Sequence, residues 1–212
     1  MPKKFKLAVL VSGRGSNLQA IIDNIESNYL PANIELVLSN TKNSFALERG
    51  KKHGLDTVFL DPKTFPNRDD YELKMIGILK SKSIDLICLA GFMQILGKKF
   101  IQAFPEKIIN IHPSLLPAFP GLNVQKKALE HGAKFSGCTV HFVSEKVDEG
   151  PIILQSTVPI LDEDDTNSLS ERILEQEHII YPEAIRLIVE KQLMFSGRRV
   201  LHRTKGNQID SD

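Results

Sequence analysis

Short apolar runs recur along the first half of this chain, each followed by a stretch with helical periodicity, and this alternation constrains the fold most strongly. The runs occupy residues 6–11, 34–38, 57–60, 85–90 and 107–111. An apolar run without a polar face is typical of a parallel strand that helices cover on both sides. The alternation therefore predicts an α/β fold with a doubly wound, mostly parallel sheet.

The second half of the chain departs from this pattern. Residues 138–143 and 152–158 each have strand character, and the short polar link between them predicts an antiparallel pair. Residues 166–191 predict a long C-terminal helix that Pro182 bends or splits. Residues 196–212 are polar, and we expect them to form a loosely held tail.

Composition limits the classes of partner. The 212 residues carry a formal net charge of +1, which gives no overall field for nucleic acid or an anionic membrane. No apolar stretch approaches the length that spans a bilayer. Two cysteines, Cys88 and Cys138, are too few for a disulfide scaffold or a cysteine-based zinc site. We interpret both as buried thiols in a reducing cytoplasm.

The fifth apolar run ends in the most informative polar residues of the chain. A period of two places the side chains of Asn110 and His112 on one face, where the predicted strand runs out. Pro113 and Pro117 stiffen the exit and prevent an immediate helix. Open α/β sheets build their sites outside the carboxyl ends of strands. The alternative is a polar pair with a purely structural role.

A glycine-rich turn at residues 12–17 follows the first apolar run and precedes a helix. Its glycines allow close approach of the backbone, the first amides of the helix would face an anion, and Ser16 can add a hydroxyl. Leu18 stands where a dinucleotide-binding turn has its third glycine, so a single phosphate fits better than a pyrophosphate. The alternative is a tight turn with an Asn cap.

The polar link between the last two strands carries Asp148, and we expect this carboxylate to reach His112. A carboxylate beside an imidazole favours the charged imidazolium. Asn110, His112 and Asp148 would then suit acyl transfer without a covalent intermediate, since the chain has no Gly-x-Ser-x-Gly elbow. A solvated loop carboxylate is the alternative reading of Asp148. We expect no metal site, because His141 lies mid-strand and no His-x-x-x-His spacing exists.

Five segments together carry a family resemblance. They are Ser-Gly-Arg-Gly-Ser-Asn at 12–17, Leu-Ala-Gly-Phe-Met at 89–93, Asn-Ile-His-Pro-Ser-Leu-Leu-Pro at 110–117, Asp-Glu-Gly-Pro-Ile at 148–152 and Gln-Glu-His-Ile-Ile-Tyr-Pro at 176–182. In this combination the chain resembles the folate-dependent phosphoribosylglycinamide formyltransferases, in order, over residues 5–190. The resemblance implies a Rossmann-like formyltransferase fold.

The resemblance also implies roles for individual residues. Asn110 and His112 would stabilise an oxyanion, and Asp148 would keep His112 protonated. Gly15, Ser16 and Asn17 would bind the substrate phosphate, and Glu177 the ribose hydroxyls. Residues implied to contact 10-formyltetrahydrofolate, a co-substrate rather than a tightly bound cofactor, are Arg68, Met93, Gln94, Ile95, Leu96, Asn110 and Val143. Gln94 replaces an Arg of some relatives and Ala118 a Lys, which affects affinity rather than chemistry.

The implied activity is transfer of the formyl group to the amine of 5-phosphoribosylglycinamide in purine synthesis. The implied partners are small molecules, without nucleic acid or membrane, and the chain would be a monomer or a homodimer. We expect one domain over residues 1–212, with an N-terminal half that binds phosphate and a C-terminal half that binds folate.

Three alternatives stay open at this point. A formyltetrahydrofolate hydrolase would carry an additional N-terminal regulatory domain, and a transfer-RNA formylase a further C-terminal domain. A non-enzymatic nucleotide-binding module would explain the glycine turn but leave Asn110, His112 and Asp148 without a task.

Overall fold

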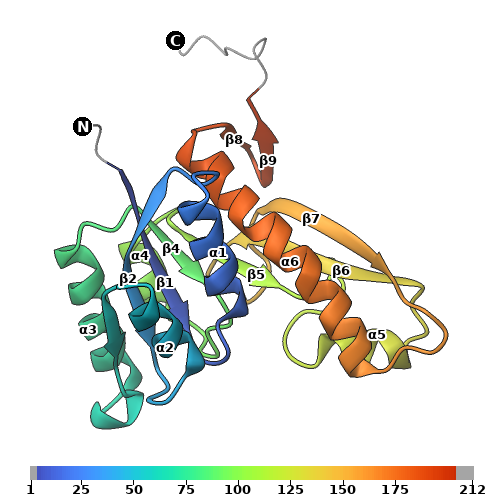
Figure 1. Ribbon diagram of the computed structural model, residues 1–212, viewed down its shortest axis with the longest axis horizontal. Helices are drawn as coiled ribbons and strands as arrows, with labels where there is room; N and C mark the ends of the chain where they lie inside the picture. Colours follow the sequence, from blue (N-terminus) through green and yellow to red (C-terminus); the bar gives the residue numbers. More distant parts are fainter. Residues whose placement is uncertain (1–3, 204–212) are drawn as a thin grey trace.

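A single seven-stranded sheet runs through the computed structural model, which describes residues 4–203 (Figure 1). Its strands lie in the order β3-β2-β1-β4-β5-β6-β7. They span Phe5–Val11 (β1), Ala32–Ser39 (β2), Thr57–Phe59 (β3), Leu86–Leu89 (β4), Ile108–His112 (β5), Phe135–Phe142 (β6) and Ile152–Pro159 (β7). The helices span Ser16–Glu26 (α1), Phe45–Lys52 (α2), Pro62–Thr64 (η1, a 3-10 turn), Arg68–Ser81 (α3), Lys98–Ala103 (α4), Val124–Glu130 (α5) and Thr166–Val189 (α6).

The first five strands are parallel, which confirms the doubly wound sheet. The chain builds outward from β1 to β3 and then returns to place β4 on the other side of β1. The order therefore reverses between β1 and β4, the point at which open α/β sheets leave a crevice at their carboxyl ends. β7 is antiparallel to β6, as expected, and β6 is antiparallel to β5. The strand that runs against the others is thus β6.

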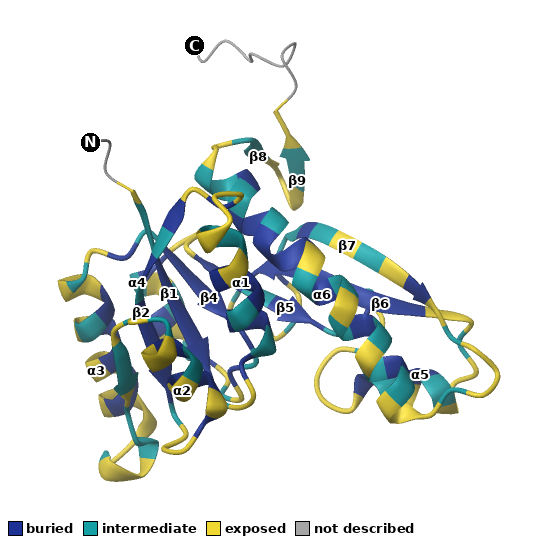
Figure 2. Ribbon diagram, viewed as in Figure 1, coloured by how far each residue is buried: buried dark blue, intermediate teal, exposed yellow. Residues whose placement is uncertain are grey.

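Helices cover both faces of the sheet because the side chains of β1 alternate between two apolar clusters. Leu7 and Val9 face the cluster that includes residues of α1 and α6, whereas Ala8 and Leu10 face the one built from α3 and α4. Figure 2 shows the consequence, since β1 and β4 are buried along most of their length. Both cysteines lie in this core as buried free thiols, and burial raises the pKa of Cys138 to about 12.

α6 is one continuous helix of 24 residues, so Pro182 does not split it. Asp165 caps its N-terminus in a capping box. A proline inside a helix costs about 3 kcal/mol. Burial of a long apolar stripe that includes Leu169, Ile173 and Tyr181 offsets that cost. The phenol of Tyr181 donates to the carbonyl of Leu89, 2.9 Å away, and ties α6 to the end of β4.

The expected loose tail is wrong for its first residues. After α6 the chain forms a hairpin of β8 (Leu193–Ser196) and β9 (Arg199–His202), beside the start of β7 in Figure 1. Leu193 and Val200 pack against the main core, and this anchors two strands that are too short to be stable alone. The rest of the expected tail, residues 204–212, lies outside the described residues. Within residues 4–203, the helices are too short or too polar to cross a membrane.

Candidate active site

The carboxyl ends of β1, β2 and β4 are held together by Ser12, the first residue after β1. Its amide donates to the carbonyl of Gly91 at 3.1 Å, and its hydroxyl donates to Asn40 Oδ1 at 2.6 Å. The amide of Met93 in turn donates to the Ser12 hydroxyl at 2.8 Å. The loops that follow these three strands are therefore fixed relative to one another at one edge of the sheet.

The glycine turn is shaped by close packing against α2. Gly15 has φ +70°, and a Cβ at this position would lie 2.6 Å from the Cβ of Ala46. Only glycine combines that backbone conformation with that approach. The amide of Ala46 donates to the Gly13 carbonyl at 3.2 Å, so α2 supports the turn. The first turn of α1 reads Ser-Asn-Leu-Gln and carries no negative charge, so no side chain of the turn opposes the attraction of the helix dipole and the first amides for an anion.

Asn17 and Glu177 meet although they are far apart in the sequence. The Asn17 amide donates to Glu177 Oε2 at 2.7 Å, and the two residues are 8% and 6% exposed. Burial raises the pKa of Glu177, and the Asn17 hydrogen bond partly counters that rise. Asn17 Oδ1 is buried and has no hydrogen-bond partner within residues 4–203. The pair thus joins α1, near the N-terminus, to α6, near the C-terminus.

A buried histidine orients Asn110. His141 Nδ1 lies 2.8 Å from the carbonyl of Phe142, which can only accept, so Nδ1 carries the proton. Burial lowers the pKa of His141, which favours the neutral ring with a bare Nε2. That nitrogen lies 3.3 Å from Asn110 Nδ2 and accepts its hydrogen bond. The carbonyl of Phe142 thus determines, through His141, which way the Asn110 amide points.

His112 and Asp148 form an ion pair at the end of β5. His112 Nδ1 lies 3.6 Å from Asp148 Oδ2, and the side chains are 7% and 10% exposed. On the other side of the ring, His112 Nε2 donates to the Phe119 carbonyl at 3.1 Å. Both ring nitrogens of His112 thus face an acceptor oxygen of the protein.

Asp148 is held in a left-handed backbone conformation, with φ +55°. Its Oδ2 accepts from the amide of Gly121 at 2.8 Å. Gly150 closes the turn, since a Cβ there would lie 1.7 Å from the carbonyl oxygen of Phe142. A non-glycine residue with positive φ persists only where its surroundings impose it. The turn at 143–150 thus aims the carboxylate at His112.

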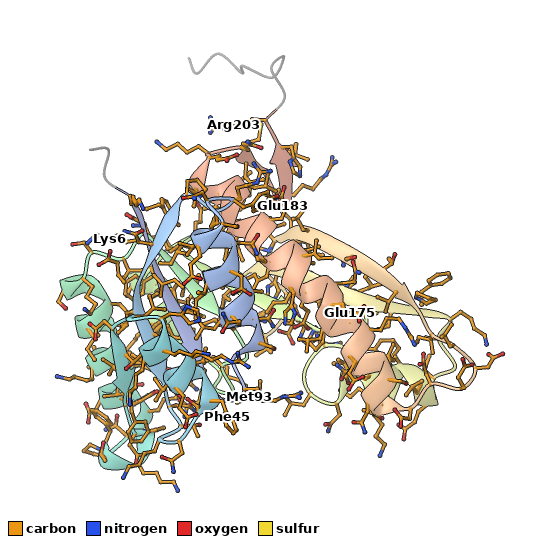
Figure 3. The ribbon with its side chains drawn as sticks, in the orientation of Figure 1. Lys6, Phe45, Met93, Glu175, Glu183 and Arg203 are labelled. Carbon is orange, nitrogen blue, oxygen red and sulfur yellow. The ribbon has the colours of Figure 1, made fainter. Side chains whose placement is uncertain are left out.

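The residues expected to contact folate lie around the loop that follows β4. The Arg68 guanidinium donates to Glu72 Oε1 at 2.7 Å and to the carbonyl of Ile95. Met93 and Ile95 are 67% and 65% exposed, and Met93 projects from the loop in Figure 3. Gln94 and Val143 are half-buried, and Val143 packs against the core cluster that contains Phe92 and Leu96 of this loop. Leu96 packs into the core, so its side chain offers little surface to a ligand.

Several residues of this arrangement were not anticipated from the sequence. Glu72 is 4% exposed and accepts from the Gly97 amide at 2.8 Å, so it links Arg68 to the loop after β4. Its i, i+4 spacing from Arg68 predicts an ion pair but not its burial. His141 lies mid-strand, and its contact with Asn110 depends on the register between β5 and β6. The main-chain groups of Phe119 and Gly121 leave no signal in the sequence.

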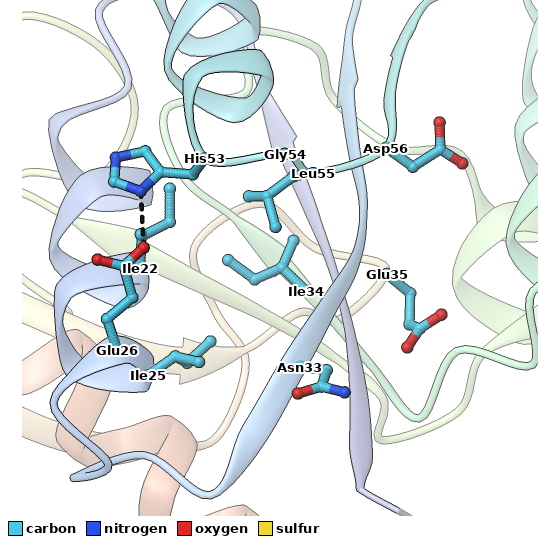
Figure 4. Close-up of a pocket in the computed structure, with 10 residues that line it drawn as sticks. All are labelled: Ile22, Ile25, Glu26, Asn33, Ile34, Glu35, His53, Gly54, Leu55 and Asp56. Carbon is cyan, nitrogen blue, oxygen red and sulfur yellow. Dashed lines mark hydrogen bonds and ion pairs between the residues drawn. The ribbon is translucent and has the colours of Figure 1, made fainter.

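A hollow of about 340 Å³ lies elsewhere, between α1 and the starts of β2 and β3 (Figure 4). It is at the opposite edge of the sheet from His112, because Asn33 begins β2 rather than ends it. Its charged groups have protein partners: His53 pairs with Glu26 at 2.7 Å, Lys6 with Glu35 at 3.6 Å, and Lys82 with Asp56 at 2.5 Å. Because these groups are paired, the hollow offers a ligand little unpaired charge.

Comparison with known proteins bears on this geometry. The family model described as "Formyl transferase" matches residues 5–185. The chain belongs to the formyl transferase family. This formyl transferase is 45% identical, over 188 residues, to the phosphoribosylglycinamide formyltransferase of Haemophilus influenzae, and the match covers 89% of each chain. It also resembles the solved structure of glycinamide ribonucleotide transformylase 1 from Symbiobacterium toebii, with 46% identity, a TM-score of 0.94 and coverage of 96% of both chains.

Other relatives of this formyl transferase are much longer. It is 45% identical over 196 residues to the trifunctional purine biosynthetic protein adenosine-3 of Drosophila melanogaster. The chain covers only 14% of that protein's length.

Proposed function

We propose that this formyl transferase moves the formyl group of 10-formyltetrahydrofolate to the amine of 5-phosphoribosylglycinamide, a step of purine synthesis. The observation that carries the proposal is the grouping of Asn110, His112 and Asp148 at the end of β5, at the same sheet edge as the glycine turn. The names of the relatives at 45% and 46% identity support the choice of substrates.

The sheet order supports this assignment of subsites. β1 and β5 are separated by β4 alone, so their carboxyl ends lie roughly 10 Å apart. A phosphorylated ribosyl amide can bridge that separation, with its phosphate on the amides of Gly15, Ser16 and Asn17 and its amine beside Asn110. Glu177, beside Asn17, accepts from the ribose hydroxyls. The exposed Met93 and Ile95 supply an apolar surface for the folate ring, and Arg68 a cation for its glutamate tail.

The reaction needs no covalent enzyme intermediate. The substrate amine attacks the formyl carbon, a carbon–nitrogen bond forms, and the carbonyl oxygen becomes an oxyanion. The bond between that carbon and folate N10 then breaks, and one proton moves from the amine to N10. Asp148, as the nearby carboxylate, holds a water that relays this proton. Binding both substrates at one edge of the sheet removes much of the entropic part of the barrier.

Two donors stabilise the oxyanion in this proposal. One is the Asn110 amide, whose orientation His141 fixes. The other is the His112 imidazolium, whose Nε2 proton the Phe119 carbonyl accepts in the free protein and the substrate oxygen would accept in its place. Removal of one such donor typically costs about 3–4 kcal/mol of transition-state stabilisation. Asp148 keeps the charge on His112.

The experiment that tests the function follows folate absorbance after mixing the protein with 10-formyltetrahydrofolate, with and without phosphoribosylglycinamide. We expect loss of the formyl group only when the amine is present. Release without the amine would identify a hydrolase, and no release in either case would favour a nucleotide-binding module. As the site of this reaction we propose the cytoplasm, where two buried free cysteines stay reduced.

A further inference from the structure

We propose that the C-terminal hairpin, residues 193–202, is a positioning element for the turn that carries Asp148. The proposal rests on the function proposed above, in which Asp148 acts on His112. Two contacts join the hairpin to this turn, one at each of its ends. The ring of Phe195 packs on the ring of Phe142 with centroids 5.1 Å apart, and the Arg198 guanidinium donates to the carbonyl of Glu149 at 2.5 Å.

The two contacts fall where the turn is closed. The amide of Phe142 donates to the carbonyl of Pro151 at 2.9 Å, which joins the two ends of the turn. Gly150 lies directly against the Phe142 carbonyl. The hairpin therefore contacts the base of the turn from outside, with an aromatic contact from β8 and a charged hydrogen bond from the residues that connect β8 to β9.

Close to Asp148, the internal contacts of the turn are weak. Asp148 occupies a left-handed conformation, which is less favourable for it than for glycine. The internal hydrogen bond from the Glu149 amide to the Lys146 carbonyl is long, at 3.4 Å. The Lys146–Glu149 ion pair is largely exposed, and such pairs contribute little. Arg198 adds a charge-assisted hydrogen bond to the residue that directly follows Asp148.

The hairpin itself has independent anchors. Leu193 and Val200 pack against the main core, and the amide of Arg203 donates to the Gln192 carbonyl at 2.7 Å. The hairpin is thus attached to the end of α6 and to the core. Its contacts with the turn therefore hold the turn in place relative to both. Loss of the Arg198 contact should loosen the turn without unfolding the hairpin.

The test compares Arg198→Ala with Arg203→Ala in the full chain. Arg203, labelled at the end of the hairpin in Figure 3, donates to the carbonyl of Leu193 at 3.2 Å and serves as the matched control. Its loss removes a hydrogen bond of the hairpin that does not reach the turn. The measurements are hydrogen exchange of the amides in 143–151, which needs no substrate, and kcat and KM for formyl transfer.

We expect Arg198→Ala to raise exchange in 143–151 and to lower kcat about five- to tenfold with KM for the amine unchanged, since Asp148 acts in the transition state. Arg198→Lys should restore most of the lost kcat, because one donor suffices for one carbonyl. Phe195→Ala should act in the same direction as Arg198→Ala, and Phe195→Leu less strongly. Arg203→Ala should leave both readouts at the wild-type level.

Unchanged exchange and unchanged kcat in Arg198→Ala would overturn the proposal, and so would an equal loss in Arg203→Ala. A wild-type protein that transfers no formyl group to the amine would instead refute the proposed function. The exchange comparison would still decide whether the hairpin holds the turn.

Discussion

The substitution Asp148→Asn isolates the charge of the carboxylate from its shape. Asparagine adopts the left-handed conformation at φ +55° as readily as aspartate, so the turn should keep its geometry. Its Oδ1 can still accept from the Gly121 amide, which lies 2.8 Å from the carboxylate. The same oxygen position lies 3.6 Å from His112 Nδ1, so the substitution keeps an acceptor there and removes only the charge. The amide nitrogen takes the position of Oδ1, 3.9 Å from His141 Nε2.

The size of the effect follows from the 3.6 Å between His112 Nδ1 and Asp148 Oδ2. At an effective dielectric constant of about 20, two unit charges at this separation attract by about 4–5 kcal/mol. Desolvation of the buried pair offsets part of this, so we expect a loss of about 3–4 kcal/mol from the transition state. That corresponds to a decrease in kcat of roughly 10²–10³-fold.

Steady-state kinetics with both substrates at saturation measure this decrease. KM for the amine should change little, and the thermal unfolding midpoint should stay close to that of the wild type. A kcat within a few-fold of wild type, in a variant with unchanged stability, would refute the role of the Asp148 charge.

Two further predictions concern the turn and the buried acid. Gly150→Ala should destabilise the fold by about 3 kcal/mol or more through the clash with Phe142, whereas Gly77→Ala, in open space within α3, should stabilise it by about 0.5–1 kcal/mol in denaturant titrations. Burial raises the pKa of Glu177, so the folded protein binds that proton more tightly. Stability should therefore fall as pH rises from the ordinary glutamate pKa of 4.5 through the raised pKa of the folded protein. Glu177→Gln keeps an acceptor for Asn17 and should abolish that decrease in thermal melts, while it weakens binding of the ribosyl substrate. A pH-dependence of stability that is the same in both proteins would contradict this account of Glu177.

Periodicity was sufficient to predict the parallel core of the fold. Each apolar run of the first half became a strand between helices, because continuous burial on both faces leaves a plain signature in the sequence. The effect of Pro182 was harder to predict, since the packing that tolerates it comes from the whole of α6. The direction of β6 follows from its pairing with β5, which a single sequence does not record.

The candidate site, like the fold, could be predicted from the sequence only in part. Asn110, His112 and Asp148 carry distinctive side chains at strand and loop ends, and the structure brings them together. The groups that orient them do not stand out in the sequence. They include the carbonyls of Phe119 and Phe142, whose side chains have no part in the contact. The hairpin escaped prediction because its strands have four residues each and depend on the core for stability.

The fate of the formyl carbon tests the central claim most directly. The protein would be incubated with 10-formyltetrahydrofolate labelled with ¹³C at the formyl carbon and an equimolar amount of 5-phosphoribosylglycinamide, and the products followed by carbon NMR. We predict that the label appears in a formamide on the ribosyl substrate, in step with the folate released. Label that accumulates as free formate would contradict direct transfer between the two substrates.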